Sequence, residues 1–431
     1  MTCRIALLFG ALFFASPSTA RNLGVKKTST RVPPVLAPNC RNVQISLGNV
    51  SATNFDYRGI WEDHSDMDFN SWRDTMKVFY SCLDPENFVH DIPSDSYGLV
   101  VERNVTIHGI FCEPEVPVPY NERQIHLLIH DLTYDKSMWH GLGLPQYSLA
   151  DALASGLKGS HTLAVDLWGH GDSHGETYPD PWQVLQPPFH VKTLHEIVKR
   201  LRRNQQGLWS AFENVTFVGH GFGAQLGALL LDEYPNDVNV FVGSGFPTGK
   251  LSRPYPTEWR LVPSISTDSK YAHQPLGYFA GELNSAADRE NILYGGLYDL
   301  ELAELDFVSQ DTIAVGEVCW SGSFFSDMSI PEDSKFTGQV CVLAGEFDRV
   351  ACGDLPWQVE GEACREKLQE VCNFTFPNSH LCNISVLEHT GKAWMLHKLG
   401  PQAISTIRSW SARGNSWGNL CTVLTPGAVR Y

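Results

Sequence analysis

Short apolar runs and amphipathic stretches alternate along the middle of the chain. Four runs have the length and composition of buried strands, and they cover residues 125–132, 161–169, 214–220 and 238–245. Stretches with helical spacing separate them at 147–157, 191–204 and 223–234. Because strands that alternate with helices are joined by right-handed crossovers, this pattern predicts an α/β fold with a mostly parallel central sheet and helices on both faces.

The pattern changes on both sides of this region. Residues 41–56 and 98–113 alternate between apolar and polar positions, as strands with one buried face do. Between them, 57–97 is rich in Asp, Trp and Phe, and we expect short helices or loops there. The strand-helix alternation stops near 248 and resumes with strands at 338–348 and 382–390 and a final helix at 394–412. The interruption contains helical fragments and predicts a cap inserted into the sheet.

The N-terminus has the pattern of a secretory signal. Arg4 precedes an apolar segment, 5–15, that is too short to span a bilayer, and small residues at 18–20 suit cleavage. We therefore divide the chain into five segments. They are a signal peptide at 1–20, an N-terminal leader and first strands at 21–97, a first core segment at 98–247, a cap insertion at 248–335 and a second core segment at 336–431.

Cysteines and sequons agree with export. Ten cysteines lie outside the signal, and an even number in an exported chain favours disulfides over metal ligands. N-glycosylation sequons occur at Asn49, Asn104, Asn214, Asn373 and Asn383. Together these features predict a secreted eukaryotic glycoprotein.

Charge and motifs narrow the partners. The net charge of −16 lacks the basic footprint that nucleic acids require, and no segment after the signal is long and apolar enough to span a membrane. The sequence has no dinucleotide-binding glycine motif, no P-loop and no HExxH motif, so no cofactor is expected. The spacing of His170, Asp172 and His174 suits a metal ion, but no further cluster of ligands accompanies it. We therefore expect no bound metal. The expected partner is a small molecule.

The stretch "FVGHGFGAQLGALL" at 217–230 has the form of a strand-to-helix turn that presents a nucleophile in the pattern G-x-S-x-G, but its middle residue is Gly221. Three other features occur in the matching order: "LLIHDLTYDKSMWHGL" at 127–142, "VDLWGHGDSHG" at 165–175, and the pair "VLAGEFDRV" at 342–350 with "EHTGKAWMLH" at 388–397. Over 98–412 they resemble the α/β-hydrolase superfamily, and most of all its secreted fungal branch.

The resemblance implies a role for each position. Gly221 stands in the nucleophile's place, Asp348 in that of the triad acid and Lys392 in that of the base, so nucleophile and base are both degenerate. His389 and His220 are candidate substitutes for the base. Residues His130, Asp131 and Leu132 form the loop that normally supplies one oxyanion-hole N–H, and Phe222 is expected to supply another.

Two of these positions carry unexpected charges. Asp131 replaces a glycine of the family pattern, and a carboxylate there opposes the stabilisation of an oxyanion. Lys392 is expected either to pair with Asp348 or to act as a base or Schiff-base former. If the triad mapping holds, the double substitution Gly221→Ser and Lys392→His is expected to restore some esterase activity.

Three hypotheses for function remain open. In the first, the protein binds a small, largely apolar organic molecule and promotes a non-hydrolytic conversion, as in fungal secondary metabolism. In the second, it is a non-catalytic, ligand-binding pseudoenzyme. In the third, it is an active hydrolase or esterase with a non-standard base. Ordinary serine hydrolase activity is not expected, because Gly221 has no hydroxyl and Lys392 no imidazole.

Overall fold

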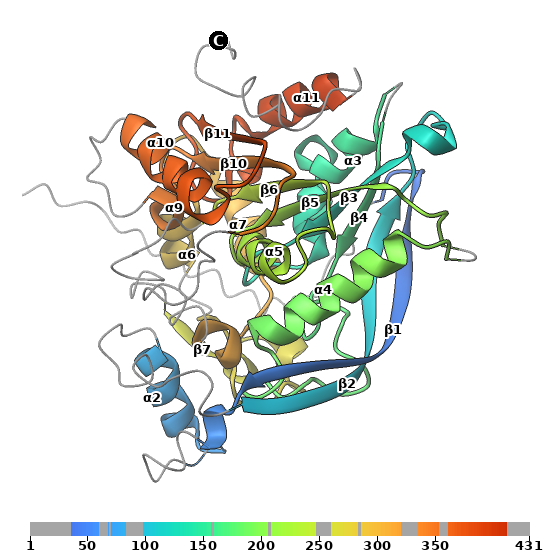
Figure 1. Cartoon of the computed structure of the whole chain (residues 1–431). Helices are drawn as coiled ribbons and strands as arrows, with labels where there is room; N and C mark the ends of the chain where they lie inside the picture. The colour runs from blue at the N-terminus through green and yellow to red at the C-terminus, as the bar shows by residue number, and fades with distance from the viewer. Residues whose placement is uncertain are drawn as a thin grey trace, which may run out of the picture.

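An eight-stranded sheet forms the centre of the protein, which we describe from a computed structural model (Figure 1). The structure describes residues 36–59, 68, 70–82, 98–156, 159–205, 208–246, 260–282, 286–319, 334–352 and 361–411. The strand order is β1-β2-β4-β3-β5-β6-β10-β11. The bounds are β1 (Cys40–Phe55), β2 (Gly98–Cys112), β3 (Gln124–Ile129), β4 (His161–Val165), β5 (Asn214–His220), β6 (Val240–Ser244), β10 (Gln339–Gly345) and β11 (Leu381–Leu387).

The sheet is parallel from β4 to β11. Strand β1 pairs antiparallel with β2, and β2 pairs antiparallel with β4, whereas the remaining pairs are parallel. The interior of β3 and β5 is buried on both faces, as expected for strands covered by helices on each side. The predicted fold class, an α/β fold with a mostly parallel sheet, is therefore confirmed.

Helices cover both faces of the sheet. In Figure 1, α4 (Pro187–Leu201) and α5 (Phe222–Glu233) lie in front of the sheet, and α3 (Leu149–Ala154) and α11 (Gly400–Ser411) lie behind it. Helix α4 begins four residues earlier than the apolar spacing predicts. The N–H groups of the first helical turn have no partner within the helix. Pro187, which lacks an N–H, can therefore start the helix without the loss of a hydrogen bond.

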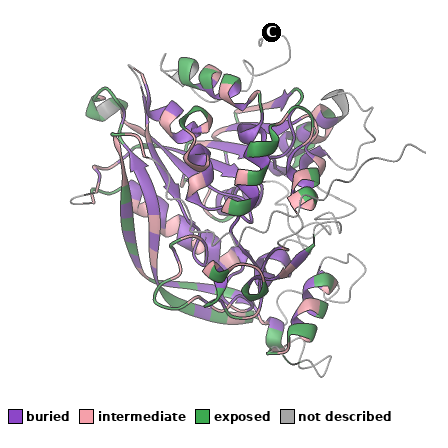
Figure 2. Ribbon diagram, turned by 180° about the vertical axis from the view of Figure 1, so that it is seen from behind, coloured by how far each residue is buried: buried purple, intermediate pink, exposed green. Residues whose placement is uncertain are grey.

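Strands β1 and β2 form a long hairpin at one edge of the sheet. Along β1, buried and exposed residues alternate, and Figure 2 shows this as stripes along the hairpin. The buried side includes Val43, Ile45 and Val50, and α4 packs against β1. A disulfide between Cys40 and Cys112 joins the two strands where β1 begins and β2 ends. The predicted strands at 41–56 and 98–113 therefore form one antiparallel unit.

The segment between β6 and β10, which we call the insertion, contains both helices and strands. Its helices are α6 (Ala286–Leu293) and α7 (Leu300–Ser309). A second sheet has the order β7-β8-β9, from β7 (Leu261–Pro263), β8 (Tyr278–Gly281) and β9 (Ile313–Ala314). The sequence indicated only helical fragments here, because strands of two to four residues are too short for an alternation to be recognised.

Helix α2 (Trp72–Cys82) lies against the insertion. Cys82 forms a disulfide with Cys319, 237 residues later in the chain. The ring of Phe79 stacks on that of Phe279 with centroids 3.9 Å apart. The polar segment before β2 thus contributes a helix that is covalently joined to the insertion.

Two short helices after β10 were not predicted. They are α9 (Arg349–Cys352) and α10 (Gly361–Glu370), followed by a π-helical turn at Val371–Thr375. Disulfides join Cys352 to Cys364 and Cys372 to Cys382. Of the five sequon asparagines, Asn383 is half-buried and the other four are exposed.

The proposed signal peptide at 1–20 lies outside the described residues. Within the portion of the chain that the structure describes, none of the helices has both the length and the apolar character needed to cross a bilayer.

Candidate functional site

Gly221 lies at the sharp turn between β5 and α5. Its φ of 51° falls in the left-handed region, which glycine adopts without the cost that a Cβ imposes. Its N–H donates to the carbonyl of Ser244 on the neighbouring strand at 2.8 Å. Close packing also requires glycine two residues earlier, because a Cβ on Gly219 would lie 2.4 Å from the carbonyl oxygen of Gly223. The local sequence therefore builds the tight strand-to-helix elbow.

The carboxylate of Asp131 occupies the space beside this elbow. Its Oδ1 accepts a hydrogen bond of 2.7 Å from the N–H of Phe222 and one of 2.8 Å from the N–H of Leu132. A Cβ on Gly221 would lie 2.2 Å from Asp131 Cγ, so a side chain at position 221 and this carboxylate exclude each other. The two N–H groups that the sequence assigned to an oxyanion hole thus converge on an oxygen of the protein itself.

Lys392 forms an ion pair with Asp131. Its Nζ lies 3.2 Å from Asp131 Oδ2 and donates to the carbonyl of Gly245 at 3.2 Å. Both side chains are buried, with 1% and 2% of their surface exposed. Burial alone would raise the pKa of Asp131, but the charge of Lys392 and the two backbone N–H groups outweigh it and lower that pKa. The sequence left open whether Lys392 pairs with Asp348 or acts as a base. Its ion pair at 3.2 Å is with Asp131, and its charge also acts on Asp348.

Asp348 lies close to this pair. Its Oδ1 accepts from the N–H groups of Val350 and Ala351, whereas its Oδ2 is buried and has no hydrogen-bond partner among the described residues. Burial raises the pKa of Asp348, and the charge of Lys392 reduces that rise. A Cβ on Gly245 would be 3.1 Å from Asp348 Oδ2 and 3.3 Å from Lys392 Nζ. The structure therefore brings Gly221, Asp348 and Lys392 together around Asp131.

The two candidate substitute histidines lie in different surroundings. His220 is buried, and its Nδ1 lies 2.9 Å from Ser244 Oγ. Trp394 Nε1 donates to the same oxygen, so the hydroxyl proton of Ser244 is left for His220. Burial, together with the charge of Lys392, lowers the pKa of His220 to about 3, which keeps its ring neutral. His389 sits in an exposed turn with a φ of 56°, and its side chain is 47% exposed, outside the buried cluster.

A second buried cluster joins the insertion to the core. Glu317 Oε1 lies 2.8 Å from His170 Nε2 and 2.9 Å from His190 Nε2. Burial alone would lower the pKa of His170 and raise that of Glu317. Even so, Glu317 and Asp311 raise the pKa of His170 to about 10, and His170 and His190 lower that of Glu317 to about 2. Sequence reasoning missed Glu317 and His190, since only the fold brings them beside His170.

The three residues of the candidate metal motif have separate partners. His170 binds Glu317, whereas Asp172 pairs with Lys136 Nζ at 2.5 Å. The ring of His174 stacks on Tyr178 with centroids 4.3 Å apart. The described geometry therefore divides this motif among three different contacts.

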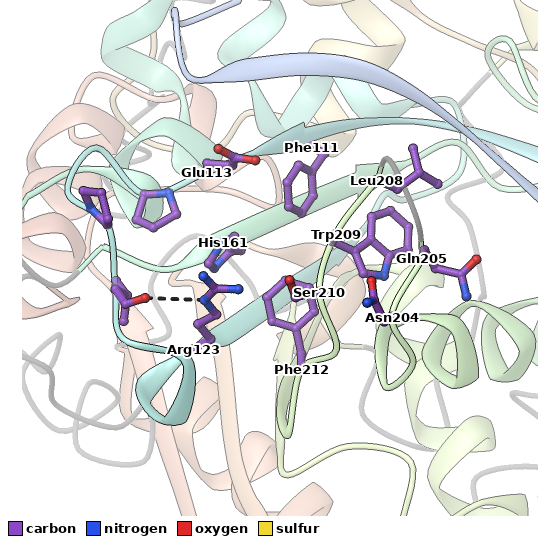
Figure 3. Close-up of a pocket in the computed structure, with 13 residues that line it drawn as sticks. Phe111, Glu113, Arg123, His161, Asn204, Gln205, Leu208, Trp209, Ser210 and Phe212 are labelled. Carbon is purple, nitrogen blue, oxygen red and sulfur yellow. Dashed lines mark hydrogen bonds between the residues drawn. The ribbon is translucent and has the colours of Figure 1, made fainter.

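A hollow of about 420 Å³ lies at the opposite edge of the sheet, near the amino ends of β3, β4 and β5 (Figure 3). Its floor includes the buried rings of Phe111, Trp209 and Phe212. The side chains of Arg123, Glu113 and His161 also line it, and burial lowers the pKa of His161 to about 4. Because a strand rises about 3.3 Å per residue, the hollow lies roughly 20 Å from the elbow.

Comparison with solved structures gives matches of low sequence identity. One of them is a monoacylglycerol lipase from Paleococcus ferrophilus (14% identity, 73% of this chain and 100% of that one, TM-score 0.45). Another is a thermophilic esterase from Thermogutta terrifontis (13% identity, 72% of this chain and 95% of that one, TM-score 0.44). None of the curated proteins compared with the chain matches it.

A family model covers the elbow and most of the parallel part of the sheet, from within β3 to within β11. The model described as the alpha/beta hydrolase family matches residues 127–383, which is more than half of the 431-residue chain. The matched region includes the elbow at Gly221, the strand that precedes Asp131 and the strand that precedes Asp348. The chain belongs to the alpha/beta hydrolase family.

Proposed function

We propose that this protein is a secreted, catalytically silent member of its family that binds a small, largely apolar organic molecule. One observation carries the proposal. Asp131 Oδ1 accepts the N–H groups of Phe222 and Leu132, the two donors that would stabilise the oxyanion of an acyl-transfer reaction. An enzyme of this type needs these donors free for its substrate.

The elbow itself supports the same conclusion. Gly221 offers no hydroxyl, and the adjacent carboxylate leaves no room for a side chain at that position. A substrate carbonyl would have to displace Asp131, and its developing negative charge would be repelled by a neighbouring carboxylate. Loss of the nucleophile and occupation of the donors therefore act together against hydrolysis.

The two catalytic alternatives have less support. A Schiff base needs a lysine nitrogen with a free electron pair that can reach a carbonyl compound, but Lys392 is buried and its Nζ faces a carboxylate. A hydrolase with a non-standard base would need His220 or His389. His220 is hydrogen-bonded to Ser244 and has a lowered pKa, and His389 lies on the exposed surface.

The hollow in Figure 3 is a candidate place for the ligand. The rings on its floor are almost completely buried and offer a small apolar contact, and the polar groups that make up most of its lining, including Arg123 and Glu113, would orient polar substituents of the ligand. Export of the protein is supported by disulfides that fix the first hairpin, helix α2 and the region after β10. The fungal setting rests on the resemblance seen in the sequence.

A labelling experiment tests catalytic silence. Purified protein is incubated with a panel of small esters and with a fluorophosphonate probe. We expect no ester turnover above the buffer rate and no covalent label on the intact protein. Turnover that depends on the protein, or a label on any residue near the elbow, would refute the proposal.

The ligand site is tested separately by native mass spectrometry. Molecules retained by the protein from its secreting host are identified, and the same measurement is made on Ser210→Trp, which fills the hollow. Ser46→Trp, on an exposed position of β1 outside the sequons, is the matched control. We expect retention of an apolar molecule by the wild-type protein and the control, but not by Ser210→Trp. Equal retention by all three would place the ligand elsewhere.

A further inference from the structure

We propose that Asn214 carries an N-glycan whose first N-acetylglucosamine binds in a hollow at the amino ends of the parallel strands. The inference rests on the proposed function only through secretion, because N-glycans are added to sequons of secreted chains. It is independent of catalytic silence, since Asn214 begins β5 and the elbow follows the other end of that strand.

The hollow has a volume of about 580 Å³, within the range of sites that take small molecules. Strands β3, β5, β6 and β10 each contribute residues at or near their amino ends. Asn214 is exposed and lines the hollow, and so does Thr216, the hydroxyl-bearing residue of the same sequon. A sugar attached to Nδ2 of Asn214 therefore starts at the wall of the hollow. No described residue that lines it also lines the hollow in Figure 3.

The described lining is polar but has no acidic or basic side chain. Asp, Glu, Lys and Arg make up 19% of the chain, yet none of them is among these residues. Five carboxamides line the hollow instead, from Gln124, Asn214, Asn236, Asn239 and Gln339, and we therefore call it the amide hollow. A carboxamide both donates and accepts hydrogen bonds, as the hydroxyl and acetamido groups of a sugar do. The lining suits a neutral, hydroxylated ligand and provides no counter-ion for a charged one.

Contacts within the protein orient two of these carboxamides. Asn239 Oδ1 accepts from the N–H of Val215 at 3.0 Å, so the NH₂ group of the same amide remains to donate. Gln124 Nε2 donates to Ser160 Oγ at 2.6 Å, so its Oε1 remains to accept. Because the protein already holds these groups, a sugar that contacts them pays little of the entropic cost of ordering side chains.

The covalent bond to Asn214 makes weak contacts sufficient. A group joined to its site by a short linker has an effective concentration in the millimolar range. The first sugar therefore occupies the amide hollow even if the same sugar free in solution binds only at millimolar concentration. A free saccharide lacks this advantage, and the described lining has no charged side chain with which to bind one more tightly. The glycan of the chain itself is thus the occupant that these contacts favour.

Digestion of the native protein with peptide-N-glycosidase tests the inference. Protein secreted by a eukaryotic host is treated in heavy-oxygen water, and peptide mass spectrometry follows the labelled aspartate that release of each glycan leaves. We expect the Asn214 glycan to be released about tenfold more slowly than that of Asn104, which is exposed on β2, because one or two net hydrogen bonds give that protection. After denaturation, both should be released at the same rate.

A filled hollow provides the second comparison. Asn236→Trp places a large ring in the amide hollow at an exposed position, and we expect it to speed release from Asn214 to the rate of Asn104. Ser46→Trp, on an exposed position of β1, is the matched control and should leave the slow release unchanged.

The remaining outcomes overturn the inference in distinguishable ways. Asn214 without a glycan, in protein that carries one at Asn104, would do so and leave secretion standing. Release from native Asn214 as fast as from Asn104, or slow release that Asn236→Trp does not change, would show that the glycan lies outside the amide hollow. Absence of glycans from every sequon would count against the proposed secretion as well. Catalytic silence is judged separately, by fluorophosphonate labelling of the same sample.

Discussion

Gly221 and Asp131 compete for one volume, because a Cβ on Gly221 would lie 2.2 Å from the Cγ of Asp131. In the elbow of a serine hydrolase, that volume belongs to the nucleophile's side chain. Here a carboxylate from the loop after β3 fills it and accepts the two nearby N–H groups. The absence of a side chain at position 221 is therefore a requirement of the Asp131 conformation, and the two residues are expected to depend on each other.

The first prediction concerns this dependence. Gly221→Ala adds a Cβ both at a positive φ and against a buried carboxylate, and we expect it to lower the free energy of unfolding by about 3 kcal/mol. Gly48→Ala is the matched control, since Gly48 also has a positive φ but open space around it, and about 1 kcal/mol is expected there. In an Asp131→Gly background, Gly221→Ala should lower the free energy of unfolding by no more than Gly48→Ala does. Urea denaturation of the set measures this, and an unchanged cost in that background would show that Asp131 is not the obstacle.

The second prediction concerns restored chemistry. The substitutions Gly221→Ser and Lys392→His, which the sequence alone suggests, should give no esterase activity while Asp131 holds the N–H groups of Phe222 and Leu132. Adding Asp131→Gly frees both donors and makes room for the serine, so the triple variant should hydrolyse p-nitrophenyl esters and bind fluorophosphonate at position 221. If the double variant is as active as the triple, the carboxylate does not block the hole.

The third prediction concerns the buried charges. Lys392→Met leaves Asp131 and Asp348 without their cation, and we expect a loss of about 3–5 kcal/mol in unfolding free energy. Adding Asp131→Asn removes one of those charges but keeps an oxygen for the two N–H groups, so the double variant should be more stable than Lys392→Met alone. Thermal and urea unfolding compare the variants. A double variant less stable than the single one would argue against coupling between the two charges.

The fourth prediction concerns pH. The pKa of Glu317 falls from 4.5 to about 2 in the folded protein, so its stabilising contribution is present above pH 4.5 and is lost as the pH falls toward 2. The pKa of His170 rises from 6.5 to about 10, so its contribution is present below pH 6.5 and is lost as the pH rises toward 10. The contribution of the pair should therefore be largest between pH 4.5 and 6.5.

Glu317→Gln isolates this effect. The difference in unfolding free energy between wild-type protein and Glu317→Gln should peak within that window and shrink on both sides of it. Urea titrations across the pH range provide the comparison. A difference that does not change with pH would mean that the cluster is held by packing and neutral hydrogen bonds.

The sequence identified the elbow because the residues that form it are close together in the chain. The apolar run of β5, the glycines around Gly221 and the amphipathic α5 all lie within one short stretch. The position of Asp131 near the oxyanion donors followed from the same loop pattern. Its bond to Phe222 did not, because that contact joins residues 91 positions apart and depends on the close approach of β3 and β5.

The ion pair between Lys392 and Asp131 was not predicted, for a related reason. Asp131 and Asp348 both follow parallel strands whose carboxyl ends meet at one edge of the sheet. Sequence order gives no distance between a lysine after β11 and either carboxylate. The Glu317 cluster was missed because its members come from the insertion, α4 and the loop after β4, and no spacing connects them.

Electron density at the elbow, in a crystal structure of the secreted protein, decides whether the carboxylate fills the oxyanion hole. We predict continuous density for the Asp131 side chain, with Oδ1 within hydrogen-bonding distance of the backbone nitrogens of Phe222 and Leu132. Density for a water molecule or a ligand on those two nitrogens, with Asp131 turned toward another partner, would show that the hole is open and that catalytic silence has lost its main support.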